Sequence, residues 1–185
     1  MNTFHFHKTH FGFTLVEMLI TTSIVIIIFS IGAPAFTRIL SDIRMSAQAN
    51  DFSASVLLAR SEAIKQGRTV TLCQSSDGST CTGSNWHQGW IIFVNNSTPP
   101  NPGVVDTGDT IIKVYRDFST EGHTLNGTAN ITFNPSGQNT SGPLTLALCR
   151  SDKEIVNRVI TVAANSGRVQ ITKNYAPTGT LTSCS

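Results

Sequence analysis

The chain has 185 residues, a formal net charge of +2 and only 13% charged side chains. So small a net charge excludes a protein that binds nucleic acid or anionic membranes through its overall charge, and such binding would need a local basic patch. One long apolar run lies near the N-terminus, and the rest of the chain is long enough for one globular head that folds without a structural metal.

The apolar run extends from Phe13 to Phe36 and is broken only by Glu17 and small hydroxyl residues. A run of this length can cross a bilayer as a helix, with the basic N-terminal side in the cytoplasm. We therefore expect residues 13–36 to form a transmembrane or assembly helix and the head to be exported. An ordinary secretory signal cut after Ala35 is the competing interpretation, and it would give a mature N-terminus at Phe36.

Glu17 is the unusual residue of this segment, because an ionisable group in a membrane helix is unfavourable without a partner. If the chain is cut after Gly12, the new α-amine of Phe13 in one subunit could neutralise Glu17 of a neighbour in a staggered stack of helices. The alternative is a tolerated glutamate at the membrane interface on a plain anchor.

The sequence Gly12-Phe13-Thr14-Leu15-Val16-Glu17, directly before the apolar run, resembles the prepilin peptidase site of type IV pilins and type II secretion pseudopilins. The resemblance implies that residues 1–12 are a leader removed by prepilin peptidase, that Phe13 is N-methylated, and that Glu17 is needed for methylation and assembly. It also implies an inner-membrane protein with a periplasmic head that later joins an extracellular pilus. Pro34 lies where such helices often carry a proline, and together with Gly32 it predicts a bend or local melting.

Residues 13–66 are expected to form one helix, with residues 37–66 outside the membrane. Apolar residues recur there at spacings of three and four, and Gly67 is typical of a helix C-cap. The stripe comprises Met45, Ala49, Phe52, Val56, Ala59 and Ala63.

Residues 67–185 are predicted to form a β-rich head, because short alternating apolar runs are separated by polar turns. We predict strands at Arg68–Cys73, Gly89–Val94, Thr110–Tyr115, Ala129–Phe133, Leu144–Cys149, Arg158–Ala163 and Gly167–Thr172. The short turns favour antiparallel pairing. The expected class is α+β, a long N-terminal helix packed against an antiparallel β-sheet head, with the loop Asn95–Asp109 exposed.

The four cysteines all follow the apolar run, which predicts two disulfides in an oxidising compartment. Three pairings are open. We prefer Cys73–Cys81 with Cys149–Cys184, since this pairing joins neighbours first.

Cys73, Cys81 and the run Trp86–Phe93, followed by the C-terminal Ser166-Gly167-Arg168, resemble the GspH/FimT group of minor pilins. The resemblance implies a type IV pilin-like fold and a structural subunit, near the pilus tip, that initiates assembly and contacts other major and minor pilins. A type II secretion pseudopilin is a further alternative. We interpret Trp86 and Trp90 as large residues at the rim of the core rather than as a ligand platform.

No arrangement of residues predicts catalysis. His87 and His123 follow the leader, and neither has a Cys, His or carboxylate at metal-ligand spacing. We therefore expect no enzyme, no cofactor and no metal.

Binding of double-stranded DNA for natural transformation is the alternative function. Some members of the FimT branch are DNA receptors through a Gly-Arg-x-Arg motif, and the matching run here is Gly167-Arg168-Val169-Gln170, with Gln170 in place of the second arginine. The candidate contacts are Arg168, Lys173, Arg150, Lys153 and Arg158. The simpler interpretation is that these are solvated charges on strands.

Overall fold

The structure is a computed structural model that describes residues 12–83, 85–118, 122–127, 130–150 and 156–173, without the side chains of residues 31–35, 37, 38, 156 and 157. The chain divides into two compact units, residues 1–44 and residues 45–185. We describe each unit by itself.

Helix α1 (Leu15–Gln66) is continuous over 52 residues. It begins after Thr14, whose Oγ1 accepts a hydrogen bond from the backbone N–H of Glu17 at 3.2 Å. It ends at Gly67, whose φ of +62° is a left-handed conformation that glycine adopts without strain. The helix also runs through Pro34, so local melting is not seen there. Because proline has no N–H, the carbonyl of Ser30 lacks its usual helical donor.

The part of α1 that belongs to the second unit buries the predicted apolar stripe. Met45, Phe52 and Ala59 are fully buried, and the other members of the stripe are at most 1% exposed. A spacing of three and four places these residues on one face of the helix, so the head is built on that face.

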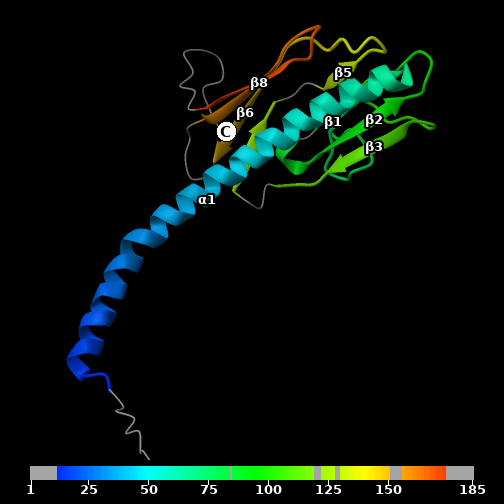
Figure 1. Cartoon of the computed structure of the whole chain (residues 1–185). Helices are drawn as coiled ribbons and strands as arrows, with labels where there is room; N and C mark the ends of the chain where they lie inside the picture. Colours follow the sequence, from blue (N-terminus) through cyan, green and yellow to red (C-terminus); the bar gives the residue numbers. More distant parts are fainter. Residues whose placement is uncertain (1–11, 84, 119–121, 128–129, 151–155, 174–185) are drawn as a thin grey trace, which may run out of the picture. The chain divides into compact units, whose positions relative to one another are not determined.

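Eight strands form the described part of the head (Figure 1). Their bounds are β1 Thr69–Gln74, β2 Trp90–Asn95, β3 Thr110–Tyr115, β4 His123–Asn126, β5 Ile131–Phe133, β6 Leu144–Arg150, β7 Val156–Val162 and β8 Val169–Lys173, with a short 3-10 helix η1 at Trp86–Gln88. The expected strands are all present to within two residues at each end, and β4 is an addition.

The strands are divided between two antiparallel sheets, a division that the predicted antiparallel β-sheet head did not specify. The strand order is β3-β2-β1-β5 in the first sheet and β4-β6-β7-β8 in the second. Asn139 links them, since its backbone N–H donates to the carbonyl of Asn165 at 2.8 Å and it also bridges to Phe133. The class predicted from the sequence, α+β with a long helix and antiparallel sheets, is confirmed.

One hydrophobic core joins α1 to the inner faces of both sheets. Phe52 of the helix lies at its centre, with ring centroids 5.1 Å from Trp86 and 5.6 Å from Trp90. Both tryptophans are almost fully buried, so their placement at the core rim was wrong. Tyr115 stacks on Trp90 at 4.9 Å, and burial together with the negative charge of Asp51 raises the pKa of Tyr115.

The outer face of the first sheet is covered as well. Cys73, Ile91 and Phe93 form a second cluster there. The predicted Cys73–Cys81 disulfide is present, with the two Cα atoms 5.6 Å apart, and it holds the loop between them against this cluster.

Candidate functional site

The segment from Gly12 to Arg44 carries apolar side chains that the described residues leave uncovered. Phe13 is 75% exposed and Leu15 77%, and exposure of this kind continues along the first turns of α1. Apolar surface of this extent is unfavourable in water and is typical of membrane or protein contact. Among the described residues no helix is both long and apolar enough to cross a membrane. The span predicted over residues 13–36, which includes side chains outside the described set, stays a prediction.

Glu17 lies in the first turn of α1, where its backbone N–H is bound by Thr14. Thr14 and Glu17 have the threonine-x-x-glutamate spacing of a capping box, and a carboxylate near a helix N-terminus is favourable. Thr14 therefore caps the helix, a local structural role that we did not predict from the sequence. The signal was present, because Thr14 directly precedes the apolar helix.

The other residues of the predicted processing site are only partly within the described structure. Gly12 and Phe13 precede the helix and are exposed, whereas residues 1–11 of the leader lie outside the described residues. The side chain of Pro34 is also outside them. Cleavage, methylation and the role of Pro34 remain predictions.

Arg158, one of the candidate DNA contacts, is buried in the head. Only 5% of its surface is exposed, and its Nη2 donates a hydrogen bond to Oγ of Ser46 on α1 at 2.7 Å. The sequence could have predicted the burial of Arg158, because Arg158, Ile160 and Val162 alternate onto one face of β7. Arg158 ties β7 to the helix and does not contribute to a surface patch.

The remaining basic candidates do not share one face of the second sheet. Lys173 is paired in register with the buried Arg158, whereas Gln170 is paired with Thr161 on the opposite face. Arg168 directly precedes β8. Because it is two residues before Gln170, strand alternation places both on the same face. Arg168 is exposed and lines a cavity of about 430 Å³ together with Gln170 and Thr161.

Arg150 and Lys153 add little to a described patch. Arg150 is half-buried and pairs in register with His123 on β4. Lys153 lies outside the described residues. The structure thus leaves Arg168 as the one candidate cation, among those described, on the outer face of β7 and β8.

Gly167 of the predicted motif has a structural reason to be glycine. Its φ is +60°, and a Cβ atom there would lie 2.4 Å from Cε1 of the buried Phe133. The turn between β7 and β8 can therefore approach the core only without a side chain at this position. Packing against Phe133 therefore explains the glycine of the Gly-Arg-x-Arg-like motif, whether or not Arg168 binds a ligand.

The disulfide loop contains an acid whose charge is strongly stabilised. The hydroxyl of Thr80 donates to Oδ2 of Asp77 at 2.7 Å. Backbone N–H groups of Ser79 and Thr80 each donate to Oδ1 at 2.9 Å, as does the Ser75 hydroxyl. These bonds, with that of the Thr80 hydroxyl the strongest, hold the pKa of Asp77 well below its ordinary value.

The second predicted disulfide is only half within the described structure. Cys149 is disulfide-bonded, and its predicted partner, Cys184, lies outside the described residues. No group of three or more His, Cys, Asp or Glu side chains within the described ranges could hold a metal ion.

The geometry can be compared with known proteins. The family model for the type II transport protein GspH matches residues 48–172, more than half of the chain. The protein therefore belongs to the GspH family, which comprises minor pilins and pseudopilins. Its members are structural pilin subunits.

Solved structures of the minor pilin FimU show the same fold. A crystal structure of the type IV minor pilin FimU of Pseudomonas aeruginosa has a TM-score of 0.56 and 22% identity, over 78% of this chain and 97% of that chain. A second crystal form of FimU has a TM-score of 0.52 and 23% identity, over 76% of this chain and 99% of that chain. The structure of the minor pseudopilin EpsH of the Vibrio cholerae type 2 secretion system has a TM-score of 0.43 and 18% identity, over 69% of this chain and 95% of that chain. No functionally curated protein matches significantly.

Proposed function

We propose that this protein is a minor type IV pilin, a structural subunit that initiates or joins pilus assembly near the tip and contacts other major and minor pilins. The observation that carries the proposal is the exposed apolar segment at the start of α1 with Glu17 in its first turn. The head has its core inside residues 45–185, so its folding does not require that segment to be covered.

In this proposal prepilin peptidase cuts after Gly12 and Phe13 is N-methylated. The chain waits in the inner membrane with its head in the periplasm and then enters the extracellular pilus. Membership of the GspH family and the FimU-like fold support the proposal. The disulfide between Cys73 and Cys81 fits a head that is exported to an oxidising compartment.

Glu17 would neutralise the α-amine of Phe13 in an adjacent subunit, a role that must be separated from helix capping. Glu17→Gln makes this separation, because glutamine also fits the last position of a capping box but carries no charge. We expect Glu17→Gln to be expressed and processed yet strongly depleted from sheared pili on immunoblots.

Two variants serve as controls for this experiment. Thr14→Ala removes the hydroxyl that binds the N–H of Glu17 and keeps the acid, so we expect it to enter pili. Glu62→Gln removes a carboxylate near the other end of α1, and we expect it to enter pili as well. Normal incorporation of Glu17→Gln would contradict the proposed charge pairing.

Binding of double-stranded DNA is a second candidate, favoured by one observation. Arg168 is exposed beside a cavity on the outer face of β7 and β8, where a phosphate could reach it. Each neutralised phosphate contributes a slope of about −0.9 in log affinity against log salt, so a site with a single cation would bind weakly and be detected only at low salt.

A mobility-shift assay with double-stranded DNA and the full-length protein in detergent tests this candidate. If the candidate is correct, the DNA shifts at low salt, Arg168→Gln removes the shift, and Arg116→Gln, at another exposed arginine, retains it. Absence of a shift at low salt would exclude DNA binding by this subunit alone.

A further inference from the structure

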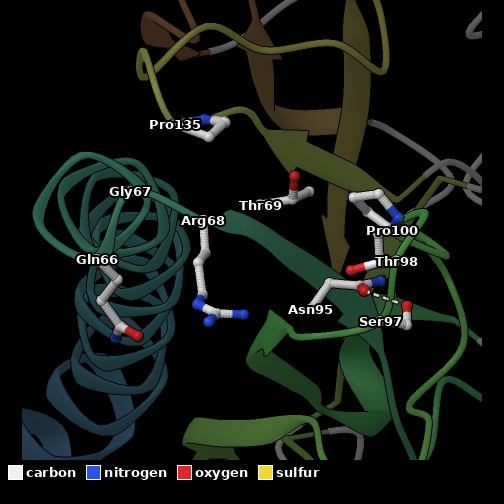
Figure 2. Close-up of a pocket in the computed structure, with 9 residues that line it drawn as sticks. All are labelled: Gln66, Gly67, Arg68, Thr69, Asn95, Ser97, Thr98, Pro100 and Pro135. Carbon is white, nitrogen blue, oxygen red and sulfur yellow. Dashed lines mark hydrogen bonds between the residues drawn. The ribbon is translucent and has the colours of Figure 1, made fainter.

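A cavity of about 470 Å³ lies beside the C-terminal end of α1 (Figure 2). Its walls come from the end of the helix with the start of β1, from the loop after β2, and from the turn after β5. All the lining residues belong to the unit of residues 45–185. The volume lies in the usual range of small-ligand sites, toward its lower end.

Arg68 supplies a positive charge to this cavity. Figure 2 shows its side chain extending into the space between α1 and Asn95. The described lining includes no acidic residue, and Arg68 has no hydrogen-bond or ion-pair partner among the described residues.

The acid nearest in sequence to Arg68, Glu62, already has partners. Gln66 donates to Oε2 of Glu62 at 2.7 Å and Lys65 donates to Oε1 at 3.2 Å. These bonds lower the pKa of Glu62, and they direct its carboxylate to its own helix. Within the described part of the chain, the guanidinium of Arg68 is therefore left as an unpaired donor.

Asn95 supplies a second donor to the lining. Oδ1 of Asn95 accepts a bond from the Ser97 hydroxyl at 2.6 Å, which leaves the Asn95 amide with N–H groups to offer. Asn95 is 3% exposed, and no described residue accepts a hydrogen bond from its Nδ2. The hydroxyls of Thr69 and Thr98 also line the cavity. The guanidinium of Arg68 and the amide of Asn95 are thus donors without a described partner, and they suit a ligand that accepts hydrogen bonds.

We propose that this cavity binds a carboxylate, with Arg68 as the main anchor. A guanidinium can hold both oxygens of a carboxylate in a bidentate pair. The C-terminal end of α1 carries a partial negative charge, which disfavours a dianion such as phosphate more than a monoanion. Pro100 and Pro135 at the edges have no N–H and offer apolar surface to the body of the ligand.

The inference does not depend on the assembly role, because no lining residue lies in the segment before residue 45. Two sources of carboxylate share the required chemistry, the C-terminus of a protein chain and an acidic side chain.

Nuclear magnetic resonance of the full-length protein in detergent micelles tests the proposal with defined probes. Sodium acetate is titrated while the side-chain resonances of Arg68 and Asn95 are followed, with acetamide as the neutral match and inorganic phosphate as the dianion. N-acetylglycine and the α-amide of N-acetyl-aspartate then present a terminal and a side-chain carboxylate. We expect saturable shifts with the three carboxylates and none with acetamide. The source of the natural carboxylate is identified by whichever binds more tightly, N-acetylglycine or the N-acetyl-aspartate amide.

Three variants define the anchor. We expect Arg68→Gln to weaken acetate binding at least about tenfold, Arg68→Lys to weaken it less, and Arg116→Gln to leave it unchanged. Because Arg68 is exposed, Arg68→Gln should keep the wild-type melting temperature. Absence of a saturable shift, an equal response to acetamide, tighter binding of phosphate, or unchanged binding in Arg68→Gln would each overturn the proposal.

Discussion

The two parts of α1 use apolar side chains in opposite ways. In residues 13–44 the large apolar side chains that the structure describes are exposed, whereas the stripe from Met45 to Ala63 is buried against two sheets. Both parts belong to one helix, although apolar residues are nearly continuous from Phe13 to Phe36 and form only a stripe in the second part. The difference lies in what covers the side chains. The second part is covered by its own head, and in the proposed function a membrane or other subunits cover the first.

The largest expected effect on stability is at Phe52, where the helix meets the head. Phe52→Ala removes a fully buried ring that contacts Trp86 and Trp90, and we expect a loss of about 3–5 kcal/mol in the free energy of unfolding. Leu57→Ala, on the same helix but 55% exposed, should change stability by less than about 0.5 kcal/mol. Urea denaturation measures both, and equal losses would show that the two faces of the helix are not distinct.

Gly167→Ala is expected to cost about 2–4 kcal/mol, because it combines a left-handed backbone with a clash against the ring of Phe133. Gly67 is a matched control, since its φ of +62° is nearly the same and a Cβ atom added there would meet no described atom within 4 Å. Gly67→Ala should therefore cost only about 1 kcal/mol. If thermal melting shows the same loss for both, contact with the core is not what requires glycine at position 167.

Removal of the first disulfide should have a smaller effect. The double variant Cys73→Ala, Cys81→Ala opens a loop with a sequence separation of 8, which predicts a loss of about 2–3 kcal/mol from the greater entropy of the unfolded chain. Urea denaturation under non-reducing conditions gives this value. An unchanged midpoint would show that the loop is held by its hydrogen bonds alone.

The smallest effect concerns Asp77 and pH. Because the pKa of Asp77 is lowered in the folded protein, its contribution to stability is present above the ordinary value of 3.8 and is lost as pH falls toward the lowered pKa. Wild type should therefore be more stable than Asp77→Asn at pH 6, and the difference should shrink as pH falls below about 4. Thermal melting between about pH 2 and pH 6 measures it, and a difference independent of pH would contradict the assignment.

Much of the head could be predicted from local sequence. Alternation such as Leu144, Leu146 and Leu148 identified the strands, and the spacing along α1 identified its buried stripe. The division into two sheets could not be predicted, because it depends on pairings such as β1 with β5, which are distant in the sequence. Strand β4 was missed since its four residues alternate over only two buried positions, His123 and Leu125.

The candidate site was less predictable than the fold. Arg158 resembled its basic neighbours in charge, yet it lies on the inner face with Ile160 and donates to Ser46. The alternation of β7 predicts that Arg158 faces inward. Charged residues are uncommon on an inner face, so its charge led us to predict an exposed position. The capping role of Thr14 was likewise visible in its place directly before the apolar helix.

The N-terminus of the mature protein tests the central claim most directly. Intact-mass and peptide mass spectrometry of the protein purified from pili or inner membranes should find a chain that begins at a methylated Phe13. A chain that begins at Phe36 would identify residues 1–35 as an ordinary secretory signal and would contradict the proposed pilin.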